Sequence, residues 1–276
     1  GPNGYWLRGQ DTPIGDQVND YEMADGSAFS WNNPEEAAQP YKNREPRFYG
    51  IILYEGAKWM ERTPDGVASD PLGVIQVGIW EKWDNSTNQM YEVYGLDTRN
   101  GPFYPFNGGY TGYYLRKFID PAIQKNSRYQ GADTPWRYFR YGEILMNYAE
   151  ACIELGEEGE AKTYINMIRT RAGMPAITES GDALRARYRH ERRIELAFED
   201  NRFYDVRRWI MGPTGYSNAT GVNVRYKLNA DKTTAVIPTI TTINVQTRTW
   251  DDKAYFFPIP RSEMNKNDLL IENPGY

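Results

Sequence analysis

The stretch "HERRIELAFEDNRFYDVRRW" at residues 190–209 decides the fold of this chain. Ten of its twenty side chains are Asp, Glu or Arg, and aromatic and aliphatic side chains lie between them. On a helical wheel drawn at about 100° per residue, one side of the segment and of the turns before it carries Leu184, Tyr188, Ile194 and Phe198. Glu191 and Glu195 fall within this apolar stripe. The pattern predicts a helix that carries two carboxylates into the interior.

A carboxylate on a buried helix face is costly unless a cation pairs with it. Arginine suits this task because its planar guanidinium can donate two hydrogen bonds to one carboxylate. The candidate partners near these glutamates are Arg192, Arg207, Arg208 and Arg140. We therefore interpret Glu191 and Glu195 as structural ion pairs. A general acid and base is the alternative, but neighbouring arginines lower the pKa of both carboxyls rather than raise one.

Composition limits the chemistry that this chain of 276 residues can perform. It contains one cysteine, Cys152, and one histidine, His190, so we expect no internal disulfide, no transition-metal centre and no catalytic residues. We also expect no cofactor, because no phosphate-binding glycine loop occurs. Cys152 lies in a helical pattern and is expected to be buried. The net charge is −5 and no basic stripe is present, so nucleic acid is not an expected partner.

No stretch of the sequence approaches the ~20 apolar residues of a membrane helix. The first ten residues, "GPNGYWLRGQ", lack the basic and apolar segments of a signal peptide. The expectation is either a protein that is not exported or a mature or trimmed chain.

Periodicity divides the chain into a helical part and a loop-rich part. Thr134 and Pro135 are typical of a helix start, and a face containing Tyr138, Tyr141, Leu145, Tyr148, Cys152 and Leu155 follows. A second helix around residues 161–168 completes an antiparallel pair of tetratricopeptide type. Strands are predicted at 50–56, at 73–83 and within 212–250, with little regular structure between 84 and 115.

Four blocks of the sequence, in this order and spacing, closely resemble the C-terminal half of the SusD/RagB family. They are "RYGEILMNYAEACIELGE" (140–157), "INMIRTRAGMP" (165–175), the stretch at 190–209, and "FFPIPRSEMNKNDLLIENPGY" (256–276). Two earlier segments, "VNDYEMADGSAF" (18–29) and "YKNREPRFYGIILYEG" (41–56), also look like that family. The resemblance therefore covers nearly the whole chain.

The resemblance implies a mainly α fold, in which tetratricopeptide-like helix pairs adjoin an irregular, loop-rich region with short β-hairpins. Residues 1–276 would form a single SusD-like C-terminal domain, helical over 134–211 and loop-rich over 1–133 and 212–276. It further implies a surface-exposed outer-membrane lipoprotein that binds oligosaccharide and pairs with a SusC-like TonB-dependent transporter. The lipid anchor and the N-terminal half of such proteins are absent from this chain.

The expected ligand site is the loop region between residues 80 and 114, where aromatic rings alternate with polar side chains. Rings match the flat C–H faces of sugars, and carboxylates match their hydroxyl groups. The predicted ligand-binding residues are Trp80, Trp83, Asp84, Tyr104, Tyr110 and Trp31. The competing interpretation is that these rings anchor long loops. Two other functions remain as alternatives, a glycoside hydrolase on a helical scaffold and a scaffold that binds peptide or protein.

Overall fold

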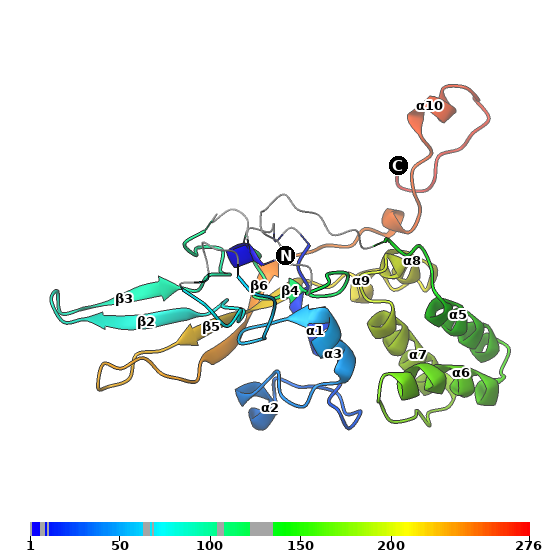
Figure 1. Cartoon of the computed structure of the whole chain (residues 1–276). Coiled ribbons are helices and arrows are strands. Elements are labelled where there is room, and N and C mark those ends of the chain that lie inside the picture. The colour runs from blue at the N-terminus through cyan, green and yellow to red at the C-terminus, as the bar shows by residue number, and fades with distance from the viewer. Residues whose placement is uncertain are drawn as a thin grey trace.

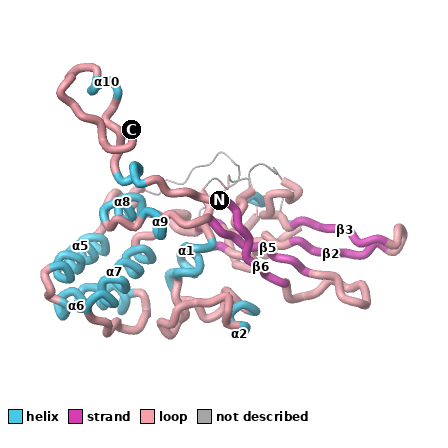
Figure 2. Tube along the Cα trace, turned by 180° about the vertical axis from the view of Figure 1, so that it is seen from behind, coloured by secondary structure: helices cyan, strands magenta, loops and turns pink. Residues whose placement is uncertain are grey.

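Helices and strands occupy opposite sides of the molecule, with the first helices between them (Figures 1 and 2). The computed structural model describes residues 2–5, 9, 11–62, 67, 69–103, 108–121 and 135–276. The N-terminus lies near the centre, and the segment around α10 (Arg261–Met264) projects away from the body. Within these residues, none of the helices combines the length and the apolar character that crossing a bilayer requires.

The helical side consists of four helices in sequence: α5 (Tyr141–Glu154), α6 (Glu158–Arg171), α7 (Gly181–Glu195) and α8 (Asn201–Arg208). α5 and α6 form a hairpin whose turn uses Gly156 at a φ of +80°. The left-handed region favours glycine because other side chains clash there. α7 packs across both helices of the hairpin.

The predicted start of α5 at Pro135 is wrong, and Thr134 lies outside the described residues. Arg140 is extended, with φ −146° and ψ 164°, and it precedes the first helical residue. Its guanidinium binds Glu195 and Glu199, which holds this residue outside the helix. The buried face of α5 also differs from the predicted one, because Tyr138, Tyr141, Tyr148 and Leu155 are exposed. The residues of this helix that are buried include Leu145, Met146, Ala149, Cys152 and Ile153.

The stretch at 190–209 forms two helices rather than one. α7 ends at Glu195, and α8 begins at Asn201. Between them Phe198 and Asp200 both have φ of 64°, a left-handed conformation that a helix does not contain. The break turns Phe198 toward the core of the strand side, where it packs against buried residues.

A four-stranded sheet with the order β3-β2-β5-β6 forms the other side of the molecule. Its strands are β2 (Ile79–Asp84), β3 (Gln89–Tyr94), β5 (Ala219–Tyr226) and β6 (Thr239–Gln246). β2 pairs antiparallel with β3 and parallel with β5, while β5 and β6 form an antiparallel hairpin. The strands predicted within 212–250 are confirmed. The strand predicted at 73–83 is confined to its second half, and β3 lies in a segment where little regular structure was expected.

The predicted strand at 50–56 is mostly wrong. Pro46 starts the short helix α3 (Pro46–Ile51), and only β1 (Ile52–Leu53) is extended, pairing with β4 (Tyr114–Leu115). Proline fits the first turn of a helix, because an N–H group at that position would have no partner within the helix. The remaining short elements are η1 (Asn3–Tyr5), α1 (Gly15–Asp20), α2 (Pro34–Ala38), α9 (Gly212–Gly215) and η3 (Asp252–Tyr255).

Two hydrophobic cores stabilise the two sides. One lies among α1, α3, β1 and the sheet, and Tyr21, Phe48 and Leu53 are fully buried in it. The other lies among α5, α6 and α7 and contains Cys152 and Leu184. The expected burial of Cys152 is confirmed.

A buried ion cluster joins the two sides, as the charged stretch predicted. Glu191 accepts hydrogen bonds of 2.6 Å from Arg47 and of 2.6 Å from Arg169. Glu195 accepts from Arg47, from Arg140 and from Arg171. Burial opposes ionisation of both carboxyls, but these arginines outweigh it and hold the pKa of each below its usual value.

The predicted partners of this cluster are only partly confirmed. Arg140 does bind Glu195. Arg192 instead pairs with Asp205, and Arg208 pairs with Asp205 and Glu150. Arg207 lies instead against the ring of Phe203 and donates to the Phe203 carbonyl.

Candidate functional site

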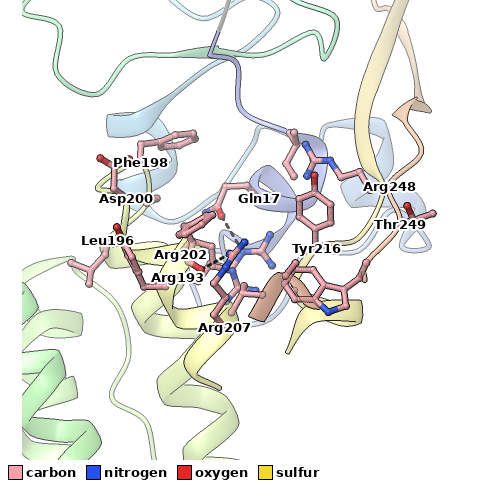
Figure 3. A pocket seen from close by; sticks show the side chains of 18 of the residues that line it. Gln17, Arg193, Leu196, Phe198, Asp200, Arg202, Arg207, Tyr216, Arg248 and Thr249 are labelled. Atoms are coloured by element: carbon pink, nitrogen blue, oxygen red, sulfur yellow. Dashed lines mark hydrogen bonds between the residues drawn. The ribbon is translucent and has the colours of Figure 1, made fainter. Parts of the chain in front are cut away.

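A pocket of about 960 Å³ opens where α1, the break between α7 and α8, and the segment after β6 meet (Figure 3). Its walls carry two kinds of side chain in unusual number. The aromatic ones are Phe198, Phe203, Tyr204, Tyr216 and Trp250, and the cationic ones are Arg193, Arg202, Arg207 and Arg248.

Local backbone geometry builds this pocket. The left-handed residues between α7 and α8 redirect the chain, so that both the break and α8 face the cavity. On the opposite wall Trp250 lies against Gly212, where an added Cβ would come within 2.0 Å of the indole ring. Only glycine permits this approach. The indole is held further by Tyr255, whose ring centroid lies 4.9 Å away.

Several rings of the pocket wall are partly exposed. Phe203, Tyr204 and Tyr216 are 43%, 61% and 44% exposed. A ligand can contact the apolar face of a half-exposed ring without any rearrangement of the surrounding protein. The aromatic wall can therefore stack against the C–H faces of a flat ligand.

The arginines of the pocket differ in their partners. Arg193 pairs with Asp20 at 2.5 Å and donates a hydrogen bond to Gln17. Arg202, Arg207 and Arg248 form no ion pair with any carboxylate in the described part of the chain. Figure 3 shows Arg193, Arg202 and Arg207 gathered near Gln17, with Arg248 beside Tyr216.

Two of these arginines are held in place by neutral groups. Arg207 donates to the Phe203 carbonyl at 2.9 Å, and its guanidinium lies 3.5 Å from the centre of the Phe203 ring. Arg248 donates to the side chain of Gln246 at 2.9 Å and lies over Tyr216. Such contacts fix the position of a guanidinium but leave its charge uncompensated.

The charge of Arg202 is only partly compensated, because Asp20 and Asp205 attract it but neither forms an ion pair with it. Burial, followed by repulsion from Arg193, lowers its pKa to about 10. Two aspartates line the pocket as well: Asp200 in the break between α7 and α8, and Asp251, which accepts the cap hydrogen bond of η3. The pocket wall is therefore cationic, and it suits hydrogen-bond acceptors and anions. In the described ranges no group of three or more His, Cys, Asp or Glu side chains is arranged to hold a metal ion.

The predicted ligand-binding residues lie elsewhere, mainly on the sheet. Trp80 stacks on Tyr226 of β5, with ring centroids 4.5 Å apart and planes 4° apart. Trp83 lies under Lys232, whose Nζ is 4.1 Å from the ring centre. Because side chains alternate along a strand, these two rings three residues apart face opposite sides of the sheet. They cannot form a single platform.

The other predicted residues are also separated from one another. Asp84 accepts hydrogen bonds from Ser86 and Thr87 in the turn that joins β2 to β3, and these hydrogen bonds lower its pKa to about 2. Tyr110 is 62% exposed and lies under Arg99.

Trp31 donates to Asn19 at 3.0 Å and packs edge-on against Phe29. Tyr104 lies outside the described residues.

Reasoning from the sequence missed the pocket for an identifiable reason. A continuous helix over 190–209 would scatter the side chains that the break instead turns toward one cavity. Residues 248–251 also line the pocket. This could not be predicted from the sequence, because it depends on the path of the chain after β6. One available signal was the alternation of rings and arginines in "RFYDVRRW" (202–209) and "RTW" (248–250).

Comparison with known proteins identifies relatives of the whole chain. The model of the SusD family matches residues 3–276. SusD-like protein P2 of Formosa agariphila is 28% identical over 229 residues, which cover 74% of this chain and 40% of that protein.

Solved structures give the same result. A SusD-like protein from Bacteroides fragilis is 33% identical, with a TM-score of 0.67 over 96% of this chain and 47% of that one. A SusD-like carbohydrate-binding protein from the same species is 27% identical, with a TM-score of 0.66 over 93% of this chain and 47% of that one. The chain thus spans less than half the length of these relatives.

Proposed function

Because the chain belongs to the SusD family, we propose that it binds oligosaccharides at the cell surface without cleaving them. The observation that carries this proposal is the pocket behind the break of α7 and α8, which combines half-exposed rings with guanidinium donors. Sugars present flat C–H faces and a rim of hydroxyl oxygens, and this combination matches both. A similar B. fragilis protein is described as carbohydrate-binding.

The ring set on the sheet, Trp80 and Trp83 of β2, offers further proposed contacts, one on each face, and Asp84 ends the same strand. The other residues predicted from sequence are proposed as separate contacts: Tyr110, Trp31 and Tyr104, the last of which lies outside the described residues. Of all these, Tyr110 is best suited to ligand, because its ring is exposed and Arg99 lies 4.0 Å from its centre. An extended oligosaccharide has room to touch more than one such surface.

The larger setting of the protein is also a proposal. We propose that the chain acts in a surface-exposed outer-membrane lipoprotein, which is anchored through a lipid group and delivers sugar to a SusC-like TonB-dependent transporter. Within it, α5 and α6 would be a tetratricopeptide-like pair. Residues 1–276 would form a single domain, and support comes from ion pairs between the two sides, such as Arg47–Glu191 and Arg169–Glu22.

Calorimetric titration of the 276-residue chain with a panel of oligosaccharides and peptides tests the proposal. We expect saturable binding of at least one saccharide and no new reducing ends after long incubation. Steady release of reducing ends would favour the glycoside hydrolase. Binding of peptides alone would favour the peptide-binding scaffold, and either result would overturn the proposed function.

A further inference from the structure

We infer that the pocket selects acidic saccharides, whose carboxylate or sulfate groups pair with Arg202 and its neighbouring arginines. This inference rests on the proposed function, because it names the class of sugar bound at the same site.

The carboxylates closest to Arg202 are already engaged. Asp20 pairs with Arg193, and Asp205 pairs with Arg192 at 2.8 Å and with Arg208 at 2.9 Å. Neither forms an ion pair with Arg202 itself. Both attract Arg202 from a distance, but a partly buried cation without a direct ion pair is unfavourable. An anion that enters the pocket therefore supplies the ion pair that the described residues do not.

Arg207 and Arg248 are positioned to bind the same anion as Arg202. Each is fixed by neutral groups, Arg207 on the ring and carbonyl of Phe203 and Arg248 on Gln246. A guanidinium fixed in this way loses little freedom when it binds, and its fork matches a carboxylate or sulfate. Asp200 and Asp251 also line the cavity, but its four arginines outnumber these two carboxylates, so the wall keeps an excess of positive charge that neutral hydroxyl groups do not need.

The rings determine that the anion is part of a sugar. Tyr204 and Tyr216 both line the pocket and are partly exposed, and they offer faces to a ring bearing C–H groups. The positive charge of the pocket is local, because the protein as a whole has a net charge of −5. An anion would therefore be attracted by the arginines of the pocket and not by the overall charge of the protein. An acidic sugar unit satisfies the rings and the guanidinium groups together.

Two matched pairs of probes test the inference by calorimetric titration of the 276-residue chain. Tetragalacturonate is compared with its fully methyl-esterified form, and a sulfated carrageenan tetrasaccharide is compared with its desulfated form. We expect at least one acidic probe to bind tenfold or more tightly than its neutral match at low salt. Its affinity should fall as salt rises, because screening weakens the ion pairs. The pair that shows the difference identifies carboxylate or sulfate.

Substitutions test whether the pocket arginines cause the difference in affinity between acidic and neutral probes. Arg202→Gln is expected to weaken the acidic probe by about thirtyfold or more. It should weaken the neutral match by a clearly smaller factor, because Gln can still donate a hydrogen bond to a hydroxyl group, so the ratio of the two affinities should fall. Arg248→Gln removes a cation from a loop on the opposite wall, so it tests the same point if Arg202→Gln fails to fold. The matched control is Arg185→Gln, which removes an exposed charge at the other end of α7 and should leave affinity unchanged.

Three results would overturn the inference. Equal affinity for acidic and neutral probes would refute it while leaving the proposed function intact. So would tight acidic binding that survives both pocket substitutions. Absence of binding to every saccharide tested would count against the proposed function as well.

Discussion

The ion cluster on α7 and the pocket just beyond its end use the same side chain for different purposes. In the cluster, Arg47, Arg140 and Arg169 each contact at least one buried glutamate. In the pocket, Arg202 and Arg207 have no carboxylate partner in the described residues. A guanidinium surrounded by carboxylates fixes the fold, whereas one held only by rings and carbonyls retains its charge for a ligand. The partners of an arginine therefore indicate its role more reliably than its position in the sequence.

The largest expected effect comes from removing a carboxylate of the cluster. Glu195→Ala leaves the largely buried Arg47 and Arg140, and the exposed Arg171, with one acceptor fewer. We expect a loss of about 3–5 kcal/mol in the free energy of unfolding. Denaturant unfolding measures this loss. Folded protein should still bind saccharide, because Glu195 does not line the pocket.

The matched control for that experiment is Glu154→Ala. This carboxylate pairs with Arg185 on the surface, so its removal should cost about 1 kcal/mol or less. If Glu195→Ala instead leaves stability unchanged and abolishes binding, the distinction between the cluster and the pocket fails.

Glu55 is a buried carboxylate whose hydrogen-bond donors are not arginines. Glu55 accepts hydrogen bonds from the backbone of Val77 and Gly78 and from Tyr226, yet burial outweighs them and raises its pKa to about 7. Because burial disfavours the ionised form of Glu55, the folded state is more stable when this carboxyl is protonated. The stabilisation is fully present below about pH 4.5, and it is lost as the pH rises to about 7.

We therefore expect Glu55→Gln to reduce the fall in stability between pH 5 and pH 7.5, by on the order of 1–3 kcal/mol relative to the unsubstituted chain. Unfolding curves at the two pH values measure it. Comparing variant with wild type at each pH cancels the titration of Glu191 and Glu195, whose lowered pKa values act in the opposite direction. Parallel curves for the two proteins would show that Glu55 does not titrate in this range.

The smallest expected effect concerns the ring set on the sheet. Lys232 covers one face of Trp83, so only part of this ring is open to sugar. Trp83→Ala should weaken saccharide binding by up to tenfold, or about 1.4 kcal/mol, with little change in the melting temperature.

Trp80→Ala provides the contrast on the opposite face of the sheet. It removes the stack on Tyr226 and should lower stability without a specific effect on affinity. A loss of affinity at Trp83 larger than at the pocket arginines would move the main site to the sheet.

The sequence predicted those parts of the molecule that depend on local pattern. The presence of α5, α6 and α7 follows from apolar periodicity, although α5 begins later than predicted and α8 was expected to continue α7. The buried, paired state of Glu191 and Glu195 follows from the cost of burying a bare charge. Arg47 and Arg169 could not be named as partners, because they lie far from these glutamates in sequence and only the fold brings them together. The break at Phe198 and Asp200 was also beyond prediction, since no glycine or proline marks it.

The candidate site depended most on such non-local geometry. The ring count between residues 80 and 114 indicated a surface rich in aromatic side chains, but strand pairing places Trp80 and Trp83 on opposite faces. The pocket arises where segments around residues 17, 202 and 250 meet, and no local pattern encodes that meeting. Composition limited the chemistry well, because one histidine and one cysteine leave few catalytic arrangements.

Cys152 has a practical consequence for studying how this molecule opens. Its thiol is 2% exposed and lies in the core between α5, α6 and α7. A thiol reagent can therefore react only when these helices separate, and the sequence contains no second cysteine to obscure the signal. The reaction rate, compared with that of a free thiol, gives the free energy of local opening on the helical side alone. The chain thus carries a built-in reporter that distinguishes partial opening from global unfolding without an engineered label.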